Sequence, residues 1–170
     1  VPGAIWHIAG RAYWYQEQGI PGSQVVIGSV WETTVFVTSG LLMYTLVGWP
    51  QIHLFSLATI LLAILLPVAL DRLIANTWRR LGLLPPSSMR PLDILTLYAF
   101  LGLAWAFGGL LLWWVTNAIY PLEVSALPSV IGVWGLAGAI GIVAGFLVGG
   151  LGIRELTLSA LLSQLVPLPV

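Results

Sequence analysis

The chain has 170 residues, of which 59% are hydrophobic and only 7% are charged. Its mean hydropathy of +1.00 sets it apart from globular proteins, in which about a quarter of the residues are charged. Six basic and six acidic residues cancel, so the net charge gives no indication of a nucleic-acid partner. The absence of cysteine excludes disulfides, thiolate catalysis and cysteine-ligated metals. The composition predicts an all-α, polytopic integral membrane protein.

Residues 4–18 alternate aromatic and polar side chains and end at the turn sequence Gly19-Ile20-Pro21-Gly22. Aromatic residues together with Arg11 are typical of the depth of the lipid head groups. We expect either the end of an upstream helix or a helix that lies in the interface. Because the chain begins at Val1 without a signal-peptide pattern, we also expect a longer polypeptide upstream.

Four apolar runs are long enough for a hydrocarbon core about 30 Å thick, which takes about 20 helical residues. We expect these spans at residues 25–47, 52–70, 94–116 and 129–150. The first two are joined by a short link and should form an antiparallel hairpin. The sequence therefore predicts one transmembrane domain, residues 1–170, built as a bundle of four spanning helices.

The basic residues predict the orientation of the bundle. Residues 71–91 form the one sizeable polar loop that we expect, and they hold four of the six basic residues. If Arg11 lies inside, strict alternation of the spans places this loop and Arg154 inside as well, as the positive-inside rule requires. We therefore expect a protein of the cell inner (plasma) membrane with a cytoplasmic loop at 71–91. The same topology places four tryptophans near the opposite face, namely Trp49, Trp113, Trp114 and Trp134.

The last apolar run, residues 156–166, is too short to cross a bilayer. Runs of this length are typical of re-entrant or interfacial segments, or of the start of a truncated span. Re-entrant backbone is tolerated only where protein or a water-filled cavity surrounds it. If the segment is re-entrant, the turn before it, residues 149–155, must lie against protein or a water-filled cavity. Its position alone then makes this turn a candidate site.

Five glycines of the fourth span fall on one helical stripe: Gly135, Gly138, Gly141, Gly145 and Gly149. Such a stripe lets another helix approach backbone to backbone. It indicates a tight helix interface, and it is also compatible with a surface that slides or lines a path for lipids.

Glu32 lies inside the first span, roughly 10 Å from its inner end at about 1.5 Å per residue. A carboxylate at depth costs a few kcal/mol, so we expect it to face protein or water and to have a partner. Arg154 is the first candidate for that partner. The alternatives are that Glu32 extends to the inner interface or is protonated.

Enzyme chemistry has no support in the sequence. His7 and His53 share no metal-like spacing, and no HExxH, GxSxG or Walker-type pattern is present. A membrane enzyme acting on lipids would need a nucleophile and a base, and no such pair is apparent. We expect neither a metal nor a cofactor.

The run from Gly149 to Glu155, GGLGIRE, precedes a small-residue apolar helix. It resembles the GGxGxRE signature of the lysylphosphatidylglycerol synthase transmembrane region, also called the flippase-like domain. Gly10-Arg11, the turn at 19–21 and Glu32 are similar to an earlier stretch of that family. The family domain is longer, so the resemblance implies that this chain is a fragment of it. No soluble aminoacyl-transferase domain is apparent in these 170 residues.

The resemblance implies a membrane domain in which the head group of an aminoacyl-phospholipid passes through a polar cavity. Three glycines then form its turn, namely Gly149, Gly150 and Gly152. Arg154 would hold a phosphate and Glu155 the ammonium of the aminoacyl group, with Glu32 nearby. The alternative function is an accessory structural subunit of a larger membrane complex, respiratory or photosynthetic, with other membrane subunits as partners.

Overall fold

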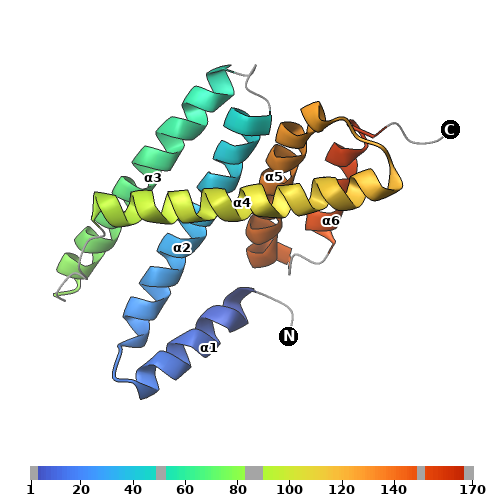
Figure 1. Cartoon of the computed structure of the whole chain (residues 1–170). Helices are drawn as coiled ribbons and strands as arrows, with labels where there is room; N and C mark the ends of the chain where they lie inside the picture. The colour runs from blue at the N-terminus through green and yellow to red at the C-terminus, as the bar shows by residue number, and fades with distance from the viewer. Residues whose placement is uncertain (1–3, 49–52, 83–89, 149–151, 167–170) are drawn as a thin grey trace.

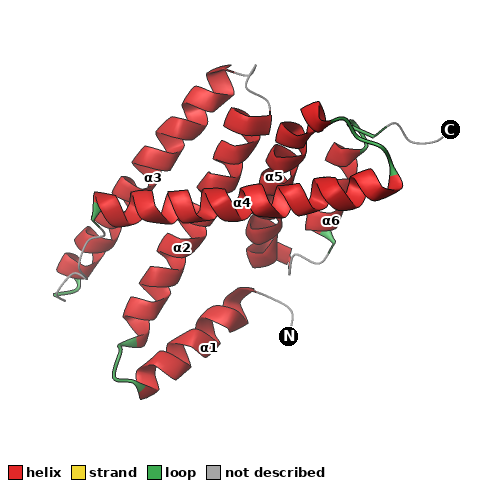
Figure 2. Cartoon of the chain, in the orientation of Figure 1, coloured by secondary structure: helices red, strands yellow, loops and turns green. Residues whose placement is uncertain are grey.

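A computed structural model describes residues 4–48, 53–82, 90–148 and 152–166 of the chain (Figure 1). Within these ranges the protein is all-α and no strand occurs (Figure 2). The longer elements are α1 (Ala4–Glu17), α2 (Gly22–Leu42), α3 (His53–Arg80), α4 (Pro91–Ile119), α5 (Leu127–Val148) and α6 (Ile153–Leu162). A π-helical segment, Met43–Gly48, continues α2, and a 3-10 turn, Val124–Ala126, precedes α5.

Among the described residues, four helices are long and apolar enough to cross a membrane: Gly22–Gly48, Phe55–Arg80, Pro91–Ile119 and Val124–Gly145. They correspond to the four expected spans, so the predicted all-α helical bundle and its membrane class are confirmed. Residues 4–17, expected as the end of a helix or an interfacial helix, form the separate helix α1. The 10-residue helix α6 is too short to cross a bilayer.

The expected polar loop at residues 71–91 is wrong over its first half. Helix α3 runs without interruption to Arg80, and the chain leaves it only near Gly82, whose φ of +69° suits glycine. Residues 71–80 contain neither glycine nor proline, so nothing in their sequence stops a helix. A charged residue ends an apolar run without ending the helix, so hydropathy alone places the end of α3 too early.

The chain reverses direction between successive long helices, and the connections alternate between two ends of the bundle (Figure 1). All six basic residues belong to segments at one of these ends. They are Arg11 of α1, Arg72, Arg79 and Arg80 late in α3, Arg90 before α4 and Arg154 in the first turn of α6. The bundle is therefore polarised in charge along its length.

Helix α5 is the centre of the bundle, because it packs against α2, the π-helical segment, α4 and α6. The contacts with α2 are made at glycines. A Cβ added at Gly40 would lie 2.5 Å from the carbonyl oxygen of Gly135, and one at Gly48 would lie 2.9 Å from Cα of Gly132. Such backbone-to-backbone approach is the usual mode of helix packing in membranes, where small residues form the interface. The glycine stripe predicted in the fourth span thus includes a tight helix interface.

Hydroxyl groups add polar links between the helices. In the π-helical segment the Thr45 hydroxyl lies 2.8 Å from the Thr59 hydroxyl of α3, and Ser56 donates to the Thr45 carbonyl at 3.1 Å. π-Helical geometry leaves carbonyl oxygens without their usual i+4 donor. The Ser56 hydroxyl supplies a donor to the Thr45 carbonyl. Side-chain hydrogen bonds of this kind stabilise helix pairs in a membrane.

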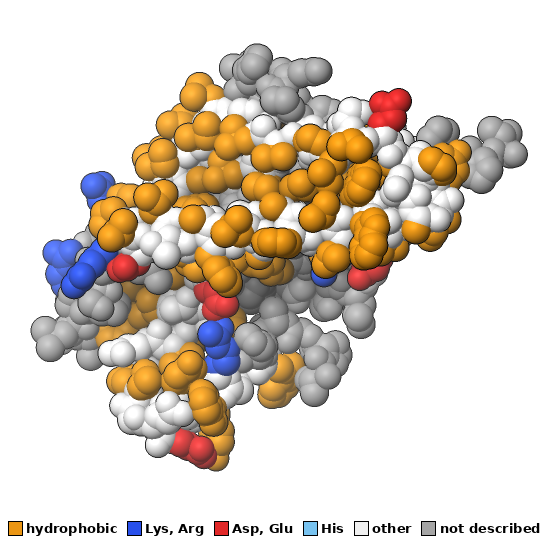
Figure 3. Space-filling model, viewed as in Figure 1, with side chains coloured by type: hydrophobic (Ala, Val, Ile, Leu, Met, Phe, Trp, Pro, Cys, Tyr) orange, Lys and Arg blue, Asp and Glu red, His pale blue; other side chains and the backbone are white. Residues whose placement is uncertain are grey.

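The outer faces of α3 and α4 are covered by large apolar side chains (Figure 3). On α3 they include Leu61, Ile64 and Leu65, and on α4 Phe100 and Phe107. A soluble domain rarely exposes so large an apolar surface. In a bilayer, lipid tails cover it without cost.

We predict that Gly40→Ala lowers the thermal stability of the purified protein in detergent, by about 1–3 kcal/mol, because the new methyl group would press on the Gly135 backbone. Gly28→Ala is the matched control, since a Cβ there meets no described atom within 4 Å. Thermal unfolding followed by circular dichroism measures both. Equal stability of the two variants would contradict the close helix packing.

Candidate functional site

The turn before α6 is built around Gly152. This residue has a φ of +87° and precedes the first turn of α6 as its N-cap, a left-handed conformation that glycine adopts without strain. Arg154 and Glu155 follow in that first turn. Gly149 and Gly150, expected to share in the turn, lie outside the described residues.

Arg154 is held against the central helix rather than released to the surface. A Cβ added at Gly141 would lie 2.8 Å from the Cβ of Arg154, so only glycine leaves room for α6 at this point. The guanidinium carbon of Arg154 stands 4.4 Å from the centroid of the Trp134 ring. A cation over an aromatic face in this geometry gains about 0.5–2 kcal/mol. The face of α5 thus provides both the space for Arg154 and a partner for its charge.

Arg154 is half-buried, and its contacts lie some way along α5 from the end of that helix. Gly141 lies about seven residues before the end of α5 at Val148, which is about 10 Å along the helix axis. Trp134 lies about two further turns from that end. Helix α6 therefore packs back along α5, with Arg154 in its first turn.

A cavity of about 290 Å³ opens beside Arg154, and we call it the α6 cavity. It is lined by Phe36 of α2, Trp105 of α4, Gly138, Gly141 and Ile142 of α5, and Arg154 and Glu155 of α6. Phe36, Trp105 and Gly138 all come from the middle of their helices. The cavity accordingly lies at mid-height between the two ends of the bundle.

Two aromatic rings form the wall opposite α6. Phe36 and Trp105 meet edge to face with centroids 4.5 Å apart, a favourable geometry. Trp105 donates from Nε1 to the Ser39 hydroxyl at 2.9 Å, and its ring covers Gly138, where a Cβ would collide with it. With its N–H occupied, Trp105 offers the cavity an apolar face. Arg154 and Glu155 are the charged groups that line it.

Glu32 does not belong to this cavity. Its carboxylate accepts a hydrogen bond from Nη1 of Arg11 at 2.6 Å, so the expected pairing with Arg154 is wrong. The carboxylate raises the pKa of the Arg11 guanidinium above its ordinary value, and Arg11 stays protonated. Because α1 folds back along the start of α2, Arg11 reaches Glu32 first. Of the expected site residues, the structure brings together Arg154 and Glu155 and separates Glu32 from them.

Sequence reasoning missed the three aromatic residues of the site. It placed Trp134 near the opposite face but did not anticipate that its ring would contact Arg154 and lie against Gly108 of α4. A signal was available, because Trp134, Gly138 and Gly141 follow the i, i+4, i+7 spacing of one helix face. Phe36 and Trp105 gave no such signal in the sequence.

His7 and His53 fall on α1 and α3, far apart in the chain. Within the described ranges no three His, Asp or Glu side chains converge as metal ligands would.

Comparison of the chain with protein-family models, with curated proteins and with solved structures finds no match. The class that the fold itself defines is a membrane-embedded, all-α bundle of four candidate spanning helices. The resemblance to the flippase-like domain stays a prediction that rests on the sequence motif.

We predict a measurable coupling between Arg11 and Glu32 and none between Arg154 and Glu32. In a double-mutant cycle with Arg11→Gln and Glu32→Gln, the interaction should be about 0.2–1 kcal/mol, the usual value for an exposed ion pair. The cycle with Arg154→Gln serves as the control, and unfolding in detergent supplies the free energies. Coupling of Glu32 to Arg154 alone would show that the ion pair is wrongly placed.

Proposed function

We propose that the chain is a membrane domain that binds a phospholipid head group in the α6 cavity and moves it between leaflets, with aminoacyl-phospholipids as the preferred class. The resemblance of residues 149–155 to the flippase-like signature supports this proposal. No covalent chemistry is part of this proposal.

One observation carries the proposal: Arg154 lines a mid-height cavity, and its guanidinium rests on Trp134. An arginine within a membrane-spanning bundle is costly, by about 2.5–3.5 kcal/mol on insertion scales, and such residues mark substrate or ion pathways. Although α6 begins at the arginine-rich end, Arg154 contacts α5 about two turns from the end of that helix. Its retention at depth therefore favours a bound anion.

The chemistry of the cavity suits a zwitterionic head group. Arg154 can hold phosphate oxygens through two parallel N–H donors, and the N-terminal end of α6 adds partial positive charge. Glu155, next in the chain, supplies a carboxylate for an ammonium group. The volume of about 290 Å³ is near the lower limit of ordinary ligand pockets, which is compatible with a head group rather than a whole lipid.

The polarised arginines support an orientation for this transport. If their end of the bundle faces the cytoplasm, as the positive-inside rule asks, the protein belongs to the plasma membrane and the α3 end with Arg79 and Arg80 is cytoplasmic. Helix α6 then enters the bundle from the cytoplasmic side, so the cavity would be loaded from the inner leaflet.

The second candidate function is that of an accessory subunit of a larger membrane complex. A specific feature favours it: Phe100, Phe107 and Trp114 recur every seven residues on the exposed face of α4, with exposed fractions of 68%, 65% and 68%. A heptad of large apolar side chains is typical of a surface that packs against another helix. Such a subunit would purify in fixed stoichiometry with partner chains and would not move lipids.

A transport assay tests the first proposal. The protein is reconstituted into vesicles with a fluorescent lysyl-phosphatidylglycerol, and dithionite measures how much label reaches the outer leaflet. We expect transport by the unaltered chain and its loss in Arg154→Ala, because the phosphate then has no cationic partner in the cavity. Arg80→Ala is the matched control and should retain transport, since Arg80 ends α3 away from the cavity.

The variant Arg154→Lys tests whether lost transport in Arg154→Ala results only from misfolding. It keeps the charge but not the two parallel donors, so it should transport slowly while unfolding at a temperature close to that of the unaltered chain. Transport by Arg154→Ala at the unaltered rate would overturn the proposal.

A further inference from the structure

On the opposite side of α2 from the α6 cavity, α3 and α4 diverge and leave a long groove. Two adjoining cavities of about 380 and 390 Å³ occupy it. They share four lining residues, Ala63 and Ile64 of α3 and Leu95 and Tyr98 of α4, and so form one continuous space. We call it the α3–α4 cleft.

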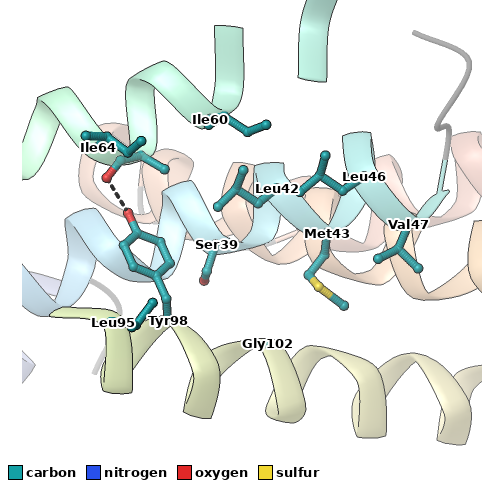
Figure 4. Close-up of a pocket in the computed structure, with 11 residues that line it drawn as sticks. Ser39, Leu42, Met43, Leu46, Val47, Ile60, Ile64, Leu95, Tyr98 and Gly102 are labelled. Atoms are coloured by element: carbon teal, nitrogen blue, oxygen red, sulfur yellow. Dashed lines mark hydrogen bonds between the residues drawn. The ribbon is translucent and has the colours of Figure 1, made fainter. Parts of the chain in front are cut away.

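The walls of the cleft are mostly apolar, and the hydroxyl groups of Tyr98 and Ser39 that line it already have partners. Figure 4 shows Ile60 of α3 across the groove from Leu42 of α2, and Ile64 beside the Tyr98 ring. The Tyr98 hydroxyl donates to the Ala63 carbonyl at 3.0 Å and lies 2.6 Å from the Thr38 hydroxyl. The Ser39 hydroxyl is taken up by Phe36 and Trp105. An occupant would thus find almost no hydrogen-bonding group, which selects for hydrocarbon.

One end of the cleft is charged. Asp71 and Arg72 line it there, where α3 approaches the arginine-rich end of the bundle. Arg72 is exposed and forms no ion pair with any residue that the structure describes. The exposed guanidinium of Arg72 at the mouth of an apolar groove is complementary to the phosphate of a lipid whose acyl chain lies in the groove.

The dimensions decide between a lipid and a partner helix. From Ile60 to Arg72 the α3 wall measures about 18 Å at 1.5 Å per residue, close to the thickness of one leaflet, about half of a 30 Å hydrocarbon core. A helix of that length and about 10 Å diameter fills about 1,400 Å³, more than the two cavities of about 380 and 390 Å³ hold together. A hydrocarbon chain is thin enough to enter.

We propose that the α3–α4 cleft binds one acyl chain of an anionic phospholipid, whose phosphate is held by Arg72. The site is separate from the α6 cavity and does not depend on transport there. It is a lipid-binding site that opens to the leaflet on the arginine-rich side.

Photo-crosslinking tests this proposal. The full chain is reconstituted in vesicles that contain phosphatidylglycerol or phosphatidylcholine with a diazirine in the acyl chain, and labelled peptides are identified by mass spectrometry. We expect labels to concentrate on the cleft-facing residues of α3 and α4, with phosphatidylglycerol preferred. Even labelling of all exposed apolar faces would overturn the proposal, as would labels that avoid the cleft because a second copy of the chain occupies it.

Two variants with matched controls sharpen the test. Gly102→Leu projects a side chain into the cleft, where a Cβ meets no described atom within 4 Å, and should remove the cleft labels. Gly28→Leu, equally unhindered but outside the cleft, should leave them unchanged.

Arg72→Gln should lower the preference for phosphatidylglycerol about fivefold, the equivalent of about 1 kcal/mol for one basic residue at the membrane surface. Arg80→Gln, which lies outside the cleft, should not change it. Unchanged cleft labelling in Gly102→Leu, or an unchanged lipid preference in Arg72→Gln, would contradict the site. Arg154→Ala should label as the unaltered chain does, so this test can succeed or fail independently of transport.

Discussion

The structure depends on the close approach of other segments to α5. In a bilayer the lipid tails are as apolar as the helix surfaces, so burial of apolar side chains does not drive helices together and packing must do so. The glycines of α5 permit that packing, because Gly132 and Gly135 admit the α2 backbone, Gly138 admits the Trp105 ring and Gly141 admits Arg154. Helix α5 therefore organises both the packing of the bundle and the surroundings of Arg154.

This arrangement gives the protein two spaces of different chemistry on either side of one wall. The α6 cavity presents Arg154 and Glu155, whereas the α3–α4 cleft has mostly apolar walls with Asp71 and Arg72 at one end. The hydrogen bond from Trp105 to Ser39 joins a lining residue of the cavity to a lining residue of the cleft. It satisfies polar groups that would otherwise face either space.

Much of the fold could be predicted from the sequence, because a run of about 20 apolar residues has few alternatives to a spanning helix. The end of α3 could not, since a helix continues past the membrane surface until a residue such as Gly82 stops it, and hydropathy does not register that point. The partner of Glu32 depends on how α1 folds back, which is a property of the turn at residues 18–21 and not of any spacing along a helix. Arg154 and Glu155 were found because charged residues are rare in this chain. Phe36, Trp105 and Trp134 were missed because in a membrane sequence an aromatic residue is as well explained by the interfacial belt or by lipid contact.

The most direct test of the account is a disulfide between α5 and α6. The chain has no cysteine of its own, so Gly141→Cys and Arg154→Cys together create a single possible pair. A Cβ built at Gly141 would lie 2.8 Å from the Cβ of Arg154, so an outward shift of α6 by about 1 Å gives the Cβ spacing of a disulfide. Oxidation in intact membranes, followed by mass spectrometry of the linked peptides, measures its formation. The account predicts nearly complete cross-linking and protection of both cysteines from a membrane-impermeant maleimide before oxidation. Rapid maleimide labelling of residue 154 without any disulfide would show that α6 lies away from the bundle, and the central role of the α5 glycines would be refuted.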